Sequence, residues 1–408
     1  ATEKGADLTL SGTTTNVESG QTVTVTFGGK NYTASVASDG SWAATVPAAD
    51  LAALPEGSAS AQASVSNING NSASAVHNYS VDSSVPTIII NTVASDNIVN
   101  ASEADAGVTV SGSTTAEAGQ IVTITLNSPT VQTYQATVQA DGSWSINIPA
   151  ADLEALTDGS HTLTATVNDK AGNPASTTHN LAVDLTVPVL TINTIAGDDI
   201  INAAEAGVAQ TISGQVTGAA VGDAVTVTLG GNTYTTTVQP GLSWSVSIPA
   251  DAIQALGNGD LTVSASVTNQ NGNTGSGTRD ITIDANLPGL RVDTVAGDDV
   301  VNIIEHGQAL VVSGSSSGLA EGTPLTVTIN NVEYTTAVQA DGSWSVGVTA
   351  AQVSAWPAGT VTVTVSGESS AENPVSITHP VMVDLTPAAI TINTIATDDV
   401  INATEKGA

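Results

Sequence analysis

The 408-residue sequence contains no cysteine, and aromatic residues make up only 3% of it. Disulfide bonds and thiol chemistry are therefore excluded. A protein without disulfides has to gain extra stability elsewhere, and bound metal ions are the obvious substitute. No apolar run reaches the roughly 18 residues that a membrane-spanning helix needs, so we expect no membrane insertion in this segment.

Basic residues are also scarce, with 6 Lys and Arg against 38 Asp and Glu, which gives a net charge of −32. Nucleic acids and anionic membrane surfaces are excluded as partners, because binding to either requires a basic surface. The acidic balance favours cations or simple solubility. Solvated surface carboxylates are the simpler explanation and account for most of the charge.

Two motifs recur four times at intervals of about one hundred residues. One is a turn followed by a tryptophan, and the other is an aspartate that precedes a short proline-containing stretch. The tryptophans are Trp42, Trp144, Trp244 and Trp344, and the aspartates are Asp82, Asp184, Asp284 and Asp384. The pattern predicts an array of similar domains in which each tryptophan lies in a core. It disfavours an enzyme, because a catalytic site is normally built once.

The repeats divide the chain into four units and a remainder. We expect repeats at 1–86, 87–186, 187–286 and 287–387, followed by the opening of another repeat at 388–408. The first repeat begins after its first strand, and the initial ATEKGA recurs at 403–408. We therefore expect a segment cut from a longer array, with any export signal outside it. The unpaired last segment could complete a neighbouring molecule by strand addition, but an arbitrary boundary explains it more simply.

The third repeat illustrates the expected fold. Its residues alternate between apolar and polar, and turn residues recur every 8–12 positions, which is typical of short antiparallel strands. Strands are expected at 189–195, 210–216, 224–230, 233–239, 243–248, 260–268 and 278–284, with one helix at 250–256. Seven strands predict an all-β, immunoglobulin-like sandwich. Four such units, each about 35–45 Å long, would form an elongated rod.

An acidic loop follows the first strand of each repeat and is the most distinctive candidate site. Its members are Asp96, Asn97 and Glu103; Asp198, Asp199 and Glu205; Asp298, Asp299 and Glu305; and Asp398, Asp399 and Glu405. In a seven-stranded sandwich this loop lies at the end where the last strand exits. We therefore expect the acidic loop to meet the aspartate that precedes the proline-containing stretch, which we call the linker aspartate.

Loops of the following repeat should face this acidic end, and Asn168, Asp169 and Asn269 are possible further ligands. Clustered carboxylates repel one another by about 1–4 kcal/mol per pair and need a cation or full solvation. Oxygen ligands without His or Cys suit Ca²⁺. A structural Ca²⁺ shared across the junction would remove its hinge freedom, and solvated charge remains the alternative.

Signatures of catalysis are absent from the sequence. No GxSxG elbow, Walker loop or dinucleotide-binding loop occurs. His77, His179 and His379 share one position in the last strand, where the third repeat has Arg279. We interpret this as a repeated surface or edge position and predict that the protein is not an enzyme.

The repeated pattern TINTIAGDDIINAAEAG, ADGSWS and VD-x-T-x-P resembles the bacterial Ig-like repeats of large biofilm-associated, Bap-type adhesins, and the resemblance covers the whole chain. Such proteins are exported by type I secretion and project from the bacterial surface. The resemblance implies an extracellular stalk in adhesion and biofilm formation, with Ca²⁺ at Asp184, Asp284, Asp384 and the matching acidic loops.

A second hypothesis makes the repeats themselves the adhesive element. They would bind other adhesin molecules, a glycan, or host and abiotic surfaces. Stacking on a sugar requires an exposed aromatic side chain, and Trp356 is the one tryptophan outside the repeated motif. A role for Trp356 in capping the core is the simpler interpretation. Pairing through edge strands is the other route to self-adhesion.

Overall fold

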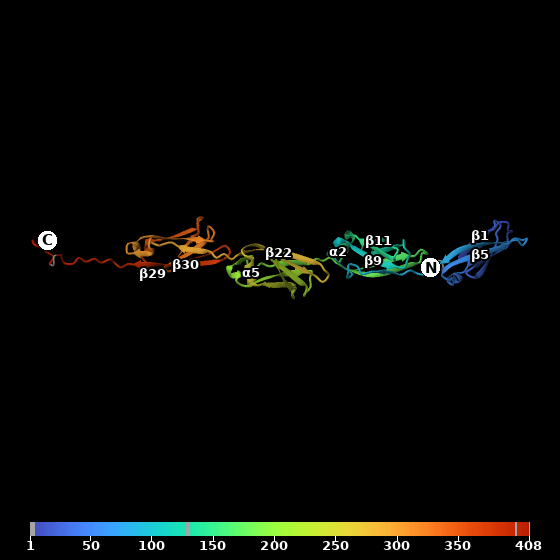
Figure 1. Ribbon diagram of the computed structural model, residues 1–408, viewed down its shortest axis with the longest axis horizontal. Coiled ribbons are helices and arrows are strands. Elements are labelled where there is room, and N and C mark those ends of the chain that lie inside the picture. The colour runs from blue at the N-terminus through green and yellow to red at the C-terminus, as the bar shows by residue number, and fades with distance from the viewer. Residues whose placement is uncertain (1–4, 128–130, 396–397, 408) are drawn as a thin grey trace. The chain divides into compact units, whose positions relative to one another are not determined.

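The computed structural model describes residues 5–127, 131–395 and 398–407, and all structural statements below refer to these residues. The fold is all-β and consists of four repeated sandwich-like units, whose strand ribbons form two layers in Figure 1. Contacts divide the chain into two compact units. The first comprises residues 1–187 with 269–273, and the second comprises residues 188–268 with 274–408.

The third sandwich contains eight strands and two helices. These elements are β15 (Val189–Ile192), β16 (Ile200–Asn202), α4 (Ala203–Ala206), β17 (Gln210–Thr217), β18 (Ala224–Leu229), β19 (Asn232–Thr237), β20 (Ser243–Ile248), α5 (Ala250–Leu256), β21 (Gly259–Thr268) and β22 (Thr274–Asp284). Seven strands match those expected from the sequence, and α5 has the expected bounds. The additional strand is β16, which lies in the acidic loop.

The strands of this sandwich form one three-stranded and one five-stranded sheet, in the orders β15-β17-β20 and β16-β22-β21-β18-β19. All pairings are antiparallel except that of β16, which runs parallel to β22 and places Asn202 opposite Asp284. The acidic loop is thereby joined to the exit of the last strand.

The second and fourth sandwiches repeat this order. The second contains β7 (Ile88–Ile90), β8 (Ile98–Asn100), α2 (Ala101–Ala106), β9 (Val108–Thr114), β10 (Ile121–Asn127), β11 (Gln132–Thr137), β12 (Ser143–Ile148), α3 (Ala150–Glu154), β13 (Gly159–Asn168) and β14 (Pro174–Asp184). The fourth contains β23 (Gly289–Val292), β24 (Val300–Asn302), η2 (Glu305–Gly307), β25 (Leu310–Ser317), β26 (Pro324–Ile329), β27 (Val332–Ala337), β28 (Ser343–Val348), α6 (Ala350–Val353), β29 (Gly359–Glu368) and β30 (Pro374–Asp384).

The first sandwich has fewer elements among its described residues. They are β1 (Leu8–Thr13), β2 (Thr22–Phe27), β3 (Lys30–Ser35), β4 (Ser41–Val46), α1 (Ala48–Ala52), β5 (Gly57–Ser66) and β6 (Ser72–Val81). Its sheets have the orders β1-β4 and β3-β2-β5-β6. After β30, the described residues include only the short 3₁₀ helix η4 (Glu405–Gly407). The four domain boundaries expected from the sequence stay a prediction.

A tryptophan and a glycine organise each complete core. The indoles of Trp144, Trp244 and Trp344 are each only 1% exposed. In the third sandwich Gly214 pairs with Trp244, and a Cβ on Gly214 would overlap the Thr191 carbonyl oxygen and lie 2.8 Å from the indole. The glycine is therefore needed so that the ring can lie flat against the strand. Trp42 is only partly buried, and Trp356 is 3% exposed within the core of the fourth sandwich.

Candidate functional site

The aspartates of the acidic loop shape the loop itself. Asp198 accepts a hydrogen bond from the Ile200 N–H at 2.9 Å, and Asp199 accepts one from the Ile195 N–H at 3.0 Å. Asp199 has a φ of 70°, a left-handed conformation that Asp and Asn tolerate better than most residues. The same pattern holds at Asp96 and Asn97, at Asp298 and Asp299, and at Asp398 and Asp399.

The glutamate of each acidic loop closes a short helical turn. Asn202 accepts a hydrogen bond from the Glu205 N–H at 3.0 Å, while Glu205 accepts one from the Asn202 N–H at 3.0 Å. This reciprocal pair is a capping box, which satisfies two backbone donors at the start of α4. Glu103 and Glu305 make the equivalent bonds with Asn100 and Asn302. The side chain of Glu405 lies outside the described residues.

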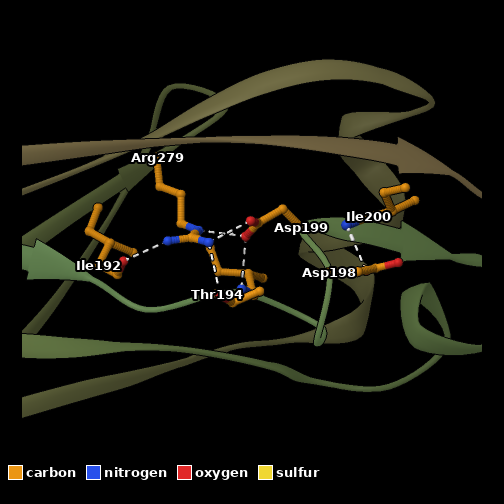
Figure 2. Close-up of polar contacts among 7 residues, drawn as sticks. Ile192, Thr194, Asp198, Asp199, Ile200 and Arg279 are labelled. Carbon is orange, nitrogen blue, oxygen red and sulfur yellow. Dashed lines mark hydrogen bonds and ion pairs between the residues drawn. The ribbon is translucent and has the colours of Figure 1, made fainter.

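A basic side chain on the last strand holds the acidic loop against the sandwich. Arg279 donates two hydrogen bonds to the Asp199 carboxylate, each 2.6 Å long, and a third to the Ile192 carbonyl at 3.0 Å (Figure 2). The hydrogen bonds from Arg279 lower the pKa of the Asp199 carboxyl. The contact joins β22, the acidic loop and β15, and a bidentate pair of this kind fixes both distance and orientation.

Histidine replaces this arginine in two other sandwiches. His179 Nε2 lies 2.7 Å from Asn97 Oδ1, and His379 Nε2 lies 2.8 Å from Asp299 Oδ1. The hydrogen bond from His379 lowers the pKa of the Asp299 carboxyl. The sequence pattern indicates a repeated surface or edge position here and does not predict this contact. The signal available in the sequence was that His179, Arg279 and His379 recur with the same period as the Asp or Asn of the acidic loop that each of them contacts.

The linker aspartates accept hydrogen bonds from the residues that follow them. Asp184 Oδ1 accepts from the Thr186 N–H at 3.1 Å, and Asp284 Oδ1 accepts from the Asn286 N–H at 3.2 Å. Asp82 and Asp384 likewise accept a hydrogen bond from the N–H two residues later, which is that of Ser84 and Thr386, respectively. The backbone hydrogen bond from Thr386 lowers the pKa of the Asp384 carboxyl.

An asparagine from a later hairpin joins the linker to the acidic loop. Within the first unit, Asn273 donates to the Asp184 carbonyl at 2.8 Å and accepts from the Ala101 N–H at 2.7 Å. Within the second unit, Asn373 makes the same two bonds, each 2.7 Å long, with the Asp284 carbonyl and the Ala203 N–H. We call this set of contacts the junction. It joins a linker, an acidic loop and a later hairpin.

The junction at Asp184 also contains polar side chains around the carboxylate. Asn271 donates to Asp184 Oδ2 at 2.6 Å, and Asn269 donates to the same oxygen at 3.4 Å. A Cβ on Gly272 would lie 3.0 Å from Asn100 Nδ2, so this hairpin also approaches the acidic loop closely. Asp184, Asn269 and Asn100, which forms the capping box with Glu103, therefore lie in one region.

The earlier junction at Asp82 has a buried carboxylate of its own. Asp169 accepts a hydrogen bond from Asn173 Nδ2 at 2.8 Å, and Asn173 also donates to the Asp82 carbonyl at 3.2 Å. Desolvation raises the pKa of the Asp169 carboxyl, but the hydrogen bonds from Asn173 and the loop backbone outweigh it and leave the pKa lowered. Asn168 is exposed at the end of β13.

The predicted ligands suit a hard cation, because they are carboxylate and amide oxygens. These side chains lie further apart than the sequence predicts. Across the described part of the chain, no three His, Cys, Asp or Glu side chains are grouped closely enough to hold a metal ion. The acidic-loop carboxylates instead accept backbone N–H groups. Each retains lone pairs for a further ligand, since an ionised carboxylate offers about four acceptor positions.

Comparisons with known proteins identify the family. The chain is 32% identical to a Ca²⁺-stabilized adhesin with which an Antarctic bacterium binds ice, and the match covers 94% of this chain and 95% of that one, with a TM-score of 0.42. This chain belongs to the bacterial Ig-like repeats of large adhesins. The bacterial Ig-like domain family matches residues 89–185 directly.

Other solved adhesins support this assignment. A tetra-tandem repeat from the extending region of a large adhesion protein is 30% identical, with 93% of this chain and 95% of that chain covered and a TM-score of 0.38. A structure concerning host cell surface retention of a 1.5-MDa bacterial ice-binding adhesin is also 30% identical, with 74% and 98% covered and a TM-score of 0.36. No curated protein matches the chain.

Membership in this family agrees with the remaining observations. Bacterial Ig-like adhesin repeats are structural rather than enzymatic. None of the described helices is long and apolar enough to cross a membrane. The more specific resemblance to Bap-type adhesins stays a prediction.

Proposed function

We propose that this chain is a spacer in the stalk of a bacterial surface adhesin, and that Ca²⁺ bound at its junctions restrains the linkers. The observation that carries the proposal is the repeated junction. In it, Asn273 and Asn373 each bond both a linker carbonyl and an acidic-loop amide. A bond pattern repeated in this way is what a spacer requires, because each linker then has a defined partner.

The location outside the cell follows from the same proposal. Large adhesins act at a cell surface, and one relative is described by its retention at the host cell surface. A role in biofilm formation and export by type I secretion come from the resemblance to Bap-type adhesins. Neighbouring repeats are the immediate partners of each sandwich. Trp356, which the sequence offered as a candidate for stacking on a sugar, is buried, and this favours the spacer over a glycan-binding repeat.

Ca²⁺ binding is proposed at the junction aspartates and the matching acidic loops. At the best-defined junction, Asp184, Asn269 and Glu103 would supply oxygen ligands. Asp284 and Asp384 would serve in the same way, together with Glu205 and Glu305. The Ca²⁺-stabilized relative and the unneutralised charge of −32 support this assignment. The cation would reduce carboxylate repulsion and connect the linker to the loops around it.

Thermal unfolding with and without calcium tests the proposal. At a free calcium concentration one hundred times the dissociation constant, binding adds about 2.7 kcal/mol of stability. The first compact unit comprises residues 1–187 with 269–273, and for a unit of about 190 residues we expect the melting temperature to rise by about 5–10 °C. Asp184→Asn should reduce this rise. Asp251→Asn, with the same change of charge at an exposed position of α5, should not. Equal melting in calcium and in chelator would contradict the calcium sites.

A further inference from the structure

The last strand of the third sandwich holds one residue of the acidic loop in two ways. The Thr282 N–H donates to the Asp199 carbonyl at 2.9 Å, and Arg279 binds the carboxylate of the same residue (Figure 2). The second and fourth sandwiches repeat the backbone bond, again at 2.9 Å, from Ala182 to Asn97 and from Met382 to Asp299. Backbone and side chain therefore fix the acidic loop to the last strand at one point.

A short parallel strand pair continues from this point. β16 lies beside the end of β22, with Ile200 opposite Thr282 and Asn202 opposite Asp284. The middle residue of β16, Ile201, is 1% exposed and belongs to the core of the sandwich. β8 beside β14 and β24 beside β30 form the same pair in the second and fourth sandwiches. Each of these short strands is thus anchored by the sheet and by the core.

The direction of the paired strands determines how they respond when the chain is stretched. Tension from the N-terminal side reaches β16 at its first residue, through β15. Tension from the C-terminal side reaches β22 at its last residue, Asp284. In a parallel pair these are opposite ends, so stretching draws the two strands past each other along their length. All bonds of the pair must then break together, whereas strands pulled apart from one end lose their bonds one by one.

We propose that this strand pair and the side-chain contact beside it form a clamp that bears tension, and that the side chain in the contact ranks the sandwiches in mechanical strength. We call the side-chain contact the latch. In the third sandwich the latch is strong. Arg279 makes two hydrogen bonds to the Asp199 carboxylate and also binds the Ile192 carbonyl and the Thr194 hydroxyl, at 3.0 Å and 2.9 Å. It therefore ties the end of β15 and the acidic loop to β22.

The latches of the other two sandwiches are weaker. In the fourth, His379 makes one contact with the Asp299 carboxylate, and in the second, His179 makes one contact with the neutral Asn97 amide. A bidentate bond between arginine and carboxylate is stronger than a single bond from histidine, and a bond to a carboxylate is stronger than one to an amide. Under tension the third sandwich should therefore outlast the fourth, and the fourth should outlast the second.

A clamp of this kind gives the chain a function beyond spacing, because a stalk that holds two surfaces together has to resist their separation. The ranking means that the sandwiches open one after another as tension persists, and each opening lengthens the chain without breaking it. The bonds of the clamp lie inside a sandwich and require no calcium. The clamp is therefore tested in chelator, where a failure of the proposed calcium sites leaves the result unchanged.

Stretching single molecules of the full chain at constant force measures the lifetime of each sandwich. Cysteine pairs across the clamp identify which opening step belongs to which sandwich, because the natural sequence has no cysteine. The three pairs are Ile200→Cys with Thr282→Cys, Val300→Cys with Met382→Cys, and Ile98→Cys with Ala182→Cys. Each disulfide encloses about eighty residues, so oxidation should shorten one step by about 260–290 Å, and reduction should restore it. Lifetimes in the order third, fourth, second are expected, and a second sandwich that outlasts the third would overturn the proposal.

Substitutions in the latch test its role under the same force. Arg279→Ala should shorten the lifetime of the third sandwich about tenfold or more, because bonds that break in the transition state control the unfolding rate. Arg291→Ala is the matched control, since Arg291 is an exposed residue of β23 and lies 3.9 Å from Asp293. It should leave every lifetime unchanged. A third sandwich whose lifetime is the same with and without Arg279 would contradict the clamp.

Two variants that strengthen the latch exclude a folding defect as the cause. His379→Arg should lengthen the lifetime of the fourth sandwich, because it brings an arginine to the Asp299 carboxylate. His179→Arg, the matched control, faces the Asn97 amide and should lengthen the lifetime of the second sandwich less. Equal gains, or no gain in either variant, would overturn the ranking.

A substitution in the core separates the clamp from overall stability. Leu229 is 1% exposed in β18, and β21 lies between β18 and β22. Leu229→Ala should lower the urea midpoint of unfolding at least as far as Arg279→Ala does. Under tension it should change the lifetime of the third sandwich by less than about threefold, because this part of the core is still packed when the clamp breaks. Lifetimes shortened equally by the two variants would show that the latch contributes only to overall stability and would overturn the proposal.

Discussion

Removal of the junction asparagine should uncouple an acidic loop from its partner hairpin. Asn373 is fully buried and bonds the Asp284 carbonyl and the Ala203 N–H. Asn373→Ala deletes both bonds and leaves two half-buried polar groups without this partner, at a cost of about 1–3 kcal/mol each if water cannot replace it. Allowing for partial access of water, we expect a total loss of about 2–4 kcal/mol.

Hydrogen exchange at the Ala203 amide measures this loss directly. If local opening limits exchange, a loss of about 2–4 kcal/mol accelerates exchange by about 30- to 700-fold. Asn71→Ala is the matched control for overall stability, because Asn71 has the same hairpin position in the first sandwich and is exposed. It should change the free energy of unfolding by at most about 0.5 kcal/mol. Exchange at Ala203 that changes less than threefold in Asn373→Ala would refute the reasoning.

Two further predictions concern the third sandwich. Because Arg279 lowers the pKa of Asp199, their pair stabilises the fold fully above about pH 4 and loses this contribution as pH falls through the lowered pKa. Arg279→Ala should therefore lower the urea midpoint of unfolding more at pH 7 than at pH 3; an equal shift at both pH values would contradict this. Gly214→Ala should cost several kcal/mol, since its Cβ would overlap the Thr191 carbonyl oxygen and lie 2.8 Å from Trp244, whereas Gly347→Ala, with open space around it, should be nearly neutral in thermal melts.

Much of the fold was predictable because local patterns determine it. The strands follow the apolar alternation, and α5 begins after a proline and ends before a glycine, as a short helix often does. The short strand β16 was not predicted. It has three residues, and its parallel partner β22 lies about eighty residues further along the sequence. A strand this short is defined by its partner rather than by its own sequence.

The region of the candidate site was also predictable, but the roles of its residues were not. The recurrence of the acidic loops located them at the exit of the last strand. What the sequence pattern does not reveal is that Asp198, Asp199 and Glu205 each accept a backbone N–H. Aspartate and glutamate serve equally as turn-formers, helix caps and metal ligands, so composition cannot separate these uses. The role of Arg279 likewise depends on a contact across eighty residues.

Small-angle X-ray scattering in calcium and in chelator tests the central claim most directly. If Ca²⁺ restrains the junctions, the maximum dimension of the wild-type chain should be larger in calcium than in chelator. The measurement is made at low protein concentration. The difference should shrink in the Asp184→Asn variant. Scattering curves that coincide with and without calcium would contradict the account and leave the acidic loops as solvated surface.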